Sequence, residues 1–217
     1  MKTRMRFLAA AALAAGLAAS VAQSNIYSSN IVGWVNVTVP AKGFVLVGNP
    51  LDTGSNVLDN ILRTAPNNIT KVYDFSPATG SYTLYTKRQG HLGGDDPPVD
   101  FSPGRGFFIQ NFAPTNITIT FTGEVWQGTN GVAYPAGFSI LASPIPVAGP
   151  LTDLGQPGDR AYQFDPATGI YMLTTFRAAG WQPSAPWLGT NSLEGVAEAF
   201  FFQAVNAGTW KRAFAAE

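Results

Sequence analysis

A sixteen-residue stretch that occurs twice constrains this chain more than any other feature of its sequence. Residues 71–86 read KVYDFSPATGSYTLYT, and residues 160–175 read RAYQFDPATGIYMLTT. In each copy, alternating aromatic residues enter a Ser/Asp-Pro-Ala-Thr-Gly turn and leave it in a second alternating run. Proline presets φ at the second turn position, and the final glycine accepts the left-handed conformation that rejoins the strands. Each copy is therefore predicted to be a β-hairpin.

The duplication extends well beyond the hairpin. Residues 43–46 correspond to 137–140 at an offset of 94, the hairpins correspond at 89, and residues 107–110 correspond to 200–203 at 93. The offset changes only between these segments, so the insertions fall in two loops while the strands keep their lengths. We expect residues 23–125 to form a first β repeat and residues 126–217 a second.

Alternation of apolar and polar residues predicts further strands. In the first copy they are residues 31–39, 44–47, 107–111 and 117–121. Leu58, Ile61 and Leu62 have the spacing of one helical turn. We predict an all-β chain of two homologous antiparallel β-sandwich or barrel-like repeats in tandem, each with one short helical turn. A single fused sandwich, in which both copies share sheets, fits the same pattern.

Residues 1–22 have the composition of a secretory signal peptide. Lys2, Arg4 and Arg6 form a basic start, residues 7–19 an Ala/Leu-rich core, and residues 20–22 a small-x-small cleavage site. The apolar run is too short for a membrane span, and no second such run follows. We therefore expect an exported protein, located outside the cell, at the cell surface or in the periplasm, with no membrane span in its mature chain.

Charge and cysteine content narrow the classes of partner and cofactor. Removal of residues 1–22 leaves 10 of the 13 Lys and Arg residues against 13 Asp and Glu. A mature chain that is slightly acidic lacks the basic field that nucleic acid requires, so we expect no nucleic-acid partner. The chain contains no cysteine, which excludes disulfides and thiolate chemistry. Stability must come from an ordinary apolar core, and we expect no cofactor.

Three motifs in order resemble those of a β-rich repeat module found in secreted and surface proteins of environmental bacteria. They are GFVLVGNP at residues 43–50, VYDFSPATGSY at 72–82 and PGRGFFI at 103–109. The resemblance implies location and architecture, and it brings no catalytic residues. The second copy departs from it, since Gly48-Asn49 becomes Ala142-Ser143. This departure suggests turns that tolerate substitution.

The residues that could hold a metal ion are few. His91 is the only histidine of the chain, so a triad or a histidine-rich metal site lacks its other members. Asp95, Asp96 and Asp100 share one loop, but their spacing differs from that of an EF-hand and no bidentate glutamate follows. We interpret these residues as a solvated loop and expect no metal site.

A glycoside hydrolase would need two carboxylates about 5–9.5 Å apart in a cleft. The sequence brings no pair of carboxylates together at that separation, and Asp74 is predicted to lie on the polar side of its strand. The candidates for such a pair are Asp74, Asp95, Asp96, Asp100, Glu124, Asp153, Asp165, Glu194 and Glu198. We expect no enzymatic activity, and a glycoside hydrolase is the weakest of the three functions considered.

Trp181 and Trp187 are the candidate ligand-binding residues. Both lie on the enlarged loop of the second copy, among glycine and proline residues. Exposed indole rings stack on sugar rings or bury against a protein, although they could instead fold back over the end of the sheet. We predict a non-catalytic structural, surface-assembly or adhesive module, with a glycan-binding module as the alternative. The expected partners are other copies of the chain or a cell-surface or extracellular polysaccharide.

Overall fold

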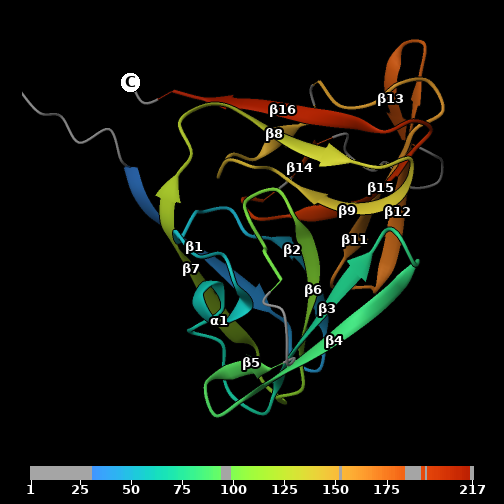
Figure 1. The fold of residues 1–217 in the computed structure, drawn as a ribbon. Helices are drawn as coiled ribbons and strands as arrows, with labels where there is room; N and C mark the ends of the chain where they lie inside the picture. The colour runs from blue at the N-terminus through green and yellow to red at the C-terminus, as the bar shows by residue number, and fades with distance from the viewer. Residues whose placement is uncertain (1–30, 94–98, 152, 184–191, 194, 216–217) are drawn as a thin grey trace, which may run out of the picture.

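A computed structural model describes residues 31–93, 99–151, 153–183, 192–193 and 195–215. The chain is all-β, as predicted, and is built from two sandwich-like halves (Figure 1). The predicted signal peptide lies outside the described residues. Among the described residues, no helix is long and apolar enough to cross a membrane.

The first half pairs a two-stranded ribbon with a five-stranded sheet. The ribbon consists of β1 (Ile31–Val39) and β7 (Ile117–Val125). The sheet has the order β2 (Phe44–Gly48), β6 (Gly106–Asn111), β3 (Thr70–Ser76), β4 (Ser81–Arg88), β5 (His91–Gly93). The helical turn α1 (Leu58–Ile61) lies where the leucine and isoleucine spacing predicted it.

The second half repeats this topology. Its ribbon consists of β8 (Gly128–Tyr134) and β16 (Gly208–Phe214). Its sheet has the order β9 (Gly137–Ala142), β15 (Ala199–Ala204), β11 (Arg160–Asp165), β12 (Ile170–Arg177), β13 (Gly180–Pro183). A short pair, β10 (Gly149–Pro150) with β14 (Ser192–Leu193), is an addition to the second half, and among the described residues α1 is confined to the first.

The strand register is the same in the two halves. Lys71 lies opposite Thr86 in the first hairpin, as Arg160 lies opposite Thr175 in the second. All named strand pairings described join strands of one half, so the halves are tandem sandwiches and the fused alternative is wrong. The duplicated sequence therefore folds twice into one topology.

The hairpin turns form by the mechanism that the sequence predicted. Gly80 and Gly169, the last turn residues, have φ angles of 66° and 73°. In the second turn the Asp165 carboxylate accepts hydrogen bonds from the Ala167 amide at 2.9 Å and the Thr168 hydroxyl at 2.6 Å. These bonds lower the pKa of Asp165, with the Thr168 hydroxyl making the largest contribution.

Each half has its own apolar core between ribbon and sheet. In the first half the inner faces of β1 and β7 cover Val72, Phe107 and Ile109 of the sheet. In the second half Trp210 of β16 is fully buried against Phe200 at a ring separation of 5.8 Å. Alternate residues of each ribbon strand face the sheet of the same half. Their side chains cover one face of that sheet, while the other residues face solvent.

The two halves meet through the outer faces of their sheets, related by an approximate two-fold axis. The Gly48 amide donates to the Ala197 carbonyl and the Ala142 amide to the Gly104 carbonyl, both at 2.9 Å. Gly48 corresponds to Ala142 in the repeat, and Gly104 corresponds to Ala197. The two bonds are therefore the same contact made twice, in opposite directions. In Figure 1, β2 and β6 accordingly lie beside β9 and β15.

Gly48 lies on this axis, against its own counterpart. A Cβ atom added to Gly48 would overlap the Cβ of Ala142, and the Arg105 carbonyl would lie 3.1 Å away. Two Cβ atoms do not fit at this pair of positions without a shift of the backbone, so one of the two residues must be glycine. The interpretation of this departure as a tolerant turn stays a prediction, and the overlap limits that tolerance to one of the two positions.

We expect Gly48→Ala to lower the free energy of unfolding by about 1–3 kcal/mol, the usual cost of overpacking. Gly33→Ala serves as the control, because its added Cβ would meet Leu51 and Val125 at ordinary distances of 3.7 and 3.9 Å. Denaturant unfolding measures both changes. The double variant Gly48→Ala, Ala142→Gly should recover most of the loss, and a double variant as unstable as the single one would contradict the two-fold contact.

Candidate functional site

Two aromatic grooves open along the junction between the halves. Groove A, of about 400 Å³, is lined by Phe44, Tyr73, Tyr82 and Phe108 of the first half and Phe164, Gly169 and Tyr171 of the second. Groove B, of about 360 Å³, is lined by Phe138, Tyr162, Tyr171 and Phe201 of the second half and Phe75 and Gly80 of the first. Most lining residues of one groove are the repeat counterparts of those of the other. The grooves are therefore twins, and both lie in the size range of small-molecule sites.

Aromatic contacts across the junction obey the same symmetry. The Phe108 and Phe201 rings, which are repeat counterparts, lie 6.2 Å apart between centroids. Phe75 meets Phe201 edge-on at 5.3 Å, and Phe164 meets Phe108 edge-on at 5.3 Å. Edge-to-face pairs at these separations are favourable beyond the apolar area that they bury. The grooves therefore have walls of interlocked rings.

Strand periodicity explains why the rings gather there. On β3, Val72 and Asp74 face the core of their own half, so Tyr73 and Phe75 point to the opposite face. The prediction that Asp74 lies on a polar side was wrong, since this residue is only 6% exposed. The sheet is covered on both faces, by its ribbon on one side and by the other half on the other.

One tyrosine of each groove forms a matched hydrogen bond to a glutamine behind it. The Tyr73 hydroxyl donates to Gln110 Oε1 at 2.6 Å, and the Tyr162 hydroxyl donates to Gln203 Oε1 at 3.0 Å. These bonds fix the two phenol oxygens beside flat ring faces, whereas the glutamines themselves are not lining residues. This combination of an apolar surface with a few fixed polar groups is typical of sites that orient a ligand.

Tyr82 and Tyr171 are repeat counterparts; both line groove A, and Tyr171 also lines groove B. Their exposed fractions are 46% and 39%, so large parts of both rings remain accessible. Partial burial raises the pKa of Tyr82. Burial, with a smaller contribution from the nearby Tyr82, raises the pKa of Tyr171 to about 12. Both phenols are therefore neutral hydrogen-bonding groups throughout the ordinary pH range.

We expect stability to fall as pH rises from 10 towards 12. The folded pKa of Tyr171, about 12, exceeds the ordinary value of 10.0, so the folded state holds a proton that the unfolded state releases. The stabilisation is complete below pH 10 and is lost as pH rises through the folded pKa. Tyr171→Phe should flatten this decline, which denaturant unfolding at a series of alkaline pH values measures. A decline of unchanged steepness in the variant would contradict the assignment.

Trp181 lies in the second half, beside the core rather than in either groove. Its indole nitrogen donates to the Leu154 carbonyl at 3.0 Å, and its ring meets Phe176 and Phe202 at 5.3 and 6.2 Å. Trp187 lies outside the described residues. The two-tryptophan platform therefore stays a prediction, and the contacts of Trp181 match the alternative in which it covers the end of the sheet.

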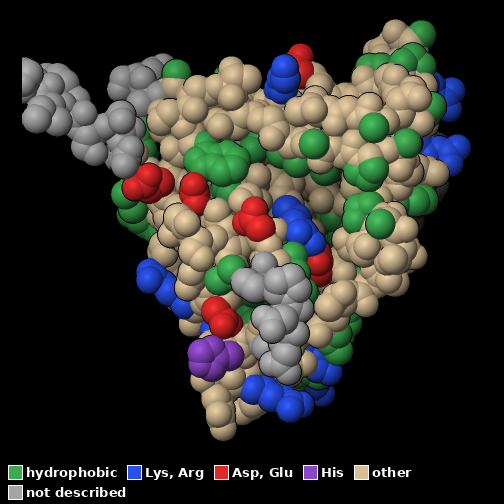
Figure 2. Space-filling view, viewed as in Figure 1, with side chains coloured by type: hydrophobic (Ala, Val, Ile, Leu, Met, Phe, Trp, Pro, Cys, Tyr) green, Lys and Arg blue, Asp and Glu red, His purple; other side chains and the backbone are tan. Residues whose placement is uncertain are grey.

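The histidine and the acidic loop do not come together as a site in the described structure. His91, the purple side chain in Figure 2, lies on the surface with its Nδ1 atom 3.2 Å from the Asp59 carboxylate. Asp100 accepts a hydrogen bond from the Ser102 hydroxyl at 2.8 Å, whereas Asp95 and Asp96 lie outside the described residues. Among the residues described, no group of three or more His, Asp or Glu side chains could hold a metal ion.

Asp74 forms an ion pair with Arg105, and the second half has an amide and a carboxylate at the corresponding positions. Arg105 Nη2 lies 2.6 Å from Asp74 Oδ2, with the guanidinium stacked 4.6 Å from the Phe101 ring centroid. The counterparts are Gln163 and Glu198, whose Nε2 and Oε1 atoms are 3.5 Å apart. The second half therefore has no cation, and its carboxylate is at the position of Arg105 rather than at that of Asp74. The buried position, Asp74 or Gln163, is polar in both halves. Asp74 therefore has a structural role.

We expect Arg105→Ala to lower the free energy of unfolding by about 3 kcal/mol, because it leaves the Asp74 carboxylate buried without its cation. The double variant Asp74→Gln, Arg105→Glu recreates the pair of the second half and should lose less. Denaturant unfolding of the two variants gives the comparison. Equal losses would show that Asp74 does not depend on Arg105.

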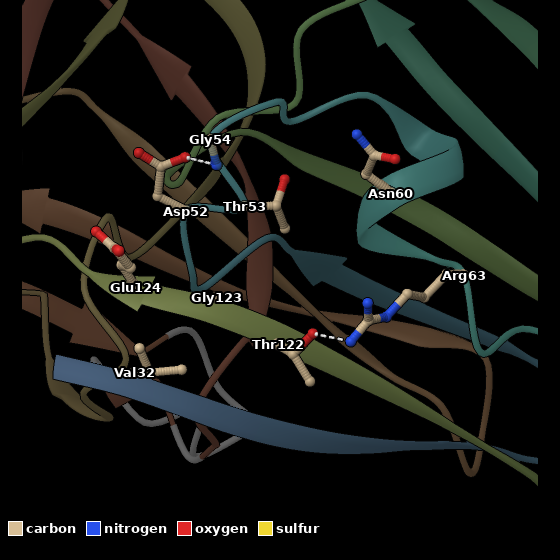
Figure 3. A pocket seen from close by; sticks show the side chains of 9 residues that line it. All are labelled: Val32, Asp52, Thr53, Gly54, Asn60, Arg63, Thr122, Gly123 and Glu124. Atoms are coloured by element: carbon tan, nitrogen blue, oxygen red, sulfur yellow. Dashed lines mark hydrogen bonds between the residues drawn. The ribbon is translucent and has the colours of Figure 1, made fainter. Parts of the chain in front are cut away.

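A polar cavity of about 610 Å³ lies between α1 and β7, away from the grooves (Figure 3). Asp52 and Glu124 line one end and Arg63 lines the other, where it donates to the Thr122 hydroxyl at 2.9 Å. Burial alone would raise the pKa of Asp52, but hydrogen bonds from Trp126, Gly54 and Asn56 outweigh it and lower the pKa. The hydrogen bonds from Trp126, Gly54 and Asn56 make Asp52 an ordered acceptor at this end of the cavity.

The groove aromatics were missed because no single segment contains them. They come from β2, β3, β4 and β6 and from their counterparts in the second half, and each short run reads as ordinary strand. One signal was available: the Tyr-x-Phe motif of each hairpin places two rings on one strand face, twice. Comparisons with protein-family models, with curated proteins and with solved structures find no match.

Proposed function

We propose that this chain is a non-catalytic adhesive module that binds an extracellular polysaccharide in grooves A and B. The observation that carries the proposal is the pair of accessible aromatic grooves related by the internal two-fold axis. Flat ring faces accommodate the apolar faces of sugar rings, and the tyrosine hydroxyls of the linings suit sugar hydroxyls. The chain would act outside the cell, as its N-terminal sequence predicts.

The composition of the walls favours a neutral ligand. The side chains that line the two grooves are phenylalanine and tyrosine, without any charged group. The raised pKa values of Tyr82 and Tyr171 keep the phenols uncharged. An anionic polymer would find no counter-charge there, whereas a neutral glycan can place the apolar faces of its rings on such walls and keep most of its hydroxyl groups in water.

The two-fold arrangement favours a polymer. Two equivalent sites on one rigid body can hold two segments of one chain, or two chains, at once. The second contact is then intramolecular, so the apparent affinity exceeds that of either groove alone. Two equivalent grooves in one chain can therefore hold a polymer more tightly than one groove can, as adhesion requires.

The test uses Phe44 and Phe138, which are repeat counterparts and line groove A and groove B respectively. Phe44→Ala and Phe138→Ala should each weaken binding to a neutral polysaccharide by about tenfold, which corresponds to about 1.4 kcal/mol. The double variant should abolish binding. Affinity electrophoresis in gels containing β-glucan, xylan or mannan measures retardation for each protein.

Phe112→Ala is the matched control, since Phe112 is 44% exposed but lines neither groove. It should bind as the unchanged chain does. Retardation that survives in the Phe44→Ala, Phe138→Ala double variant, or that is absent for the unchanged chain with every neutral polymer, would overturn the proposal.

A further inference from the structure

The free edge of β1 differs in composition from the usual edge strand of a sheet. All nine residues of β1 pair with β7 on one side, and among the described strands β7 is the only partner of β1. Its sequence, IVGWVNVTV, contains no charged residue and no proline. Natural edge strands are usually shortened, charged or covered, because unpaired backbone groups recruit another strand.

The first part of the exposed face of β1 is apolar, and Asn36 and Thr38 follow it. Val32 is 69% exposed and Trp34 is 73% exposed, the two highest values among large hydrophobic residues described. The ribbon of the second half differs in this respect. Its strand β8 exposes Thr129 and Ala133, and β16 carries Lys211 and Arg212. The apolar edge is therefore a property of the first half alone, and the duplication does not account for it.

Space for a further strand lies beside this edge. A cavity of about 390 Å³ is lined by residues 33–36 of β1, by Leu51 and Val125, and by Pro146 and Val196 of the second half. A strand added to β1 would project alternate side chains into this cavity. Backbone hydrogen bonds would provide affinity, and the cavity would provide selectivity, as in other cases of strand addition.

We propose that β1 binds β1 of a second copy of this chain, antiparallel and with Gly33 at the two-fold axis. This register places Val32 opposite Trp34 of the second copy on the exposed face, and Ile31 opposite Val35 on the inner face. Each pair is apolar, and an aromatic ring against a β-branched side chain is a favourable cross-strand pair. An uncharged edge meets no repulsion from its own copy, and the product is a four-stranded ribbon, β7-β1-β1-β7.

The inference is independent of the proposed glycan grooves, because the residues and the measurements differ. Sedimentation of the mature chain over a range of concentrations should show a dimer that dissociates on dilution, with a Kd of about 1–100 µM for so small an interface. Val32→Lys, Trp34→Lys should weaken association at least tenfold. The control Thr129→Lys, Ala133→Lys adds the same charges to exposed positions of β8 and should leave association unchanged.

Both double variants change exposed side chains, so circular dichroism and thermal unfolding should match those of the unchanged chain. A chain that remains monomeric at the highest concentration, or a Val32→Lys, Trp34→Lys variant that dimerises normally, would overturn the proposal.

Single cysteines test the register, since the chain has no cysteine of its own. Residues facing each other across an antiparallel pair have Cα atoms about 4.5–5.5 Å apart, within the range of a disulfide. Gly33→Cys should therefore form a disulfide-linked dimer under mild oxidation, whereas Trp34→Cys should not. A cross-link through position 34 and not 33 would overturn the register.

Discussion

The contact between the outer faces of the two five-stranded sheets is the interaction on which the rest of the structure depends. Each hairpin places aromatic rings on the face opposite its own core, and a sheet with two apolar faces is unfavourable alone in water. The second copy covers the first with the same rings, and the first covers the second. Reciprocal backbone bonds from Gly48 and Ala142 fix the two sheets in register.

This reciprocal covering also creates the candidate site. Rings that interlock at the axis, such as Phe108 and Phe201, leave the outer ends of the sheets less covered. Tyr82 and Tyr171 remain half-exposed there and line the grooves. Groove A and groove B are therefore consequences of how the halves pack, and each contains side chains of both. A single repeat would have a flat aromatic face instead.

The two-fold symmetry is broken at several positions of the sequence. Gly48 faces Ala142 because two methyl groups do not fit, and the Asp74–Arg105 pair becomes Gln163–Glu198 in the second half. The edge of β1, with Val32 and Trp34 exposed, has no equivalent on β8. At these positions the two copies differ in packing, charge and exposed apolar surface.

The sequence by itself determined the strands, the hairpin turns and the two tandem repeats, because periodicity and turn chemistry are local and each copy repeats them. It did not determine which face of β3 is polar, or that Asp74 is buried, because burial depends on what covers the second face of the sheet. Only the tertiary structure decided that the halves meet face to face and that aromatics from eight strands line two grooves. The packing between the halves joins residues that are far apart in the sequence, and no local pattern specifies such contacts.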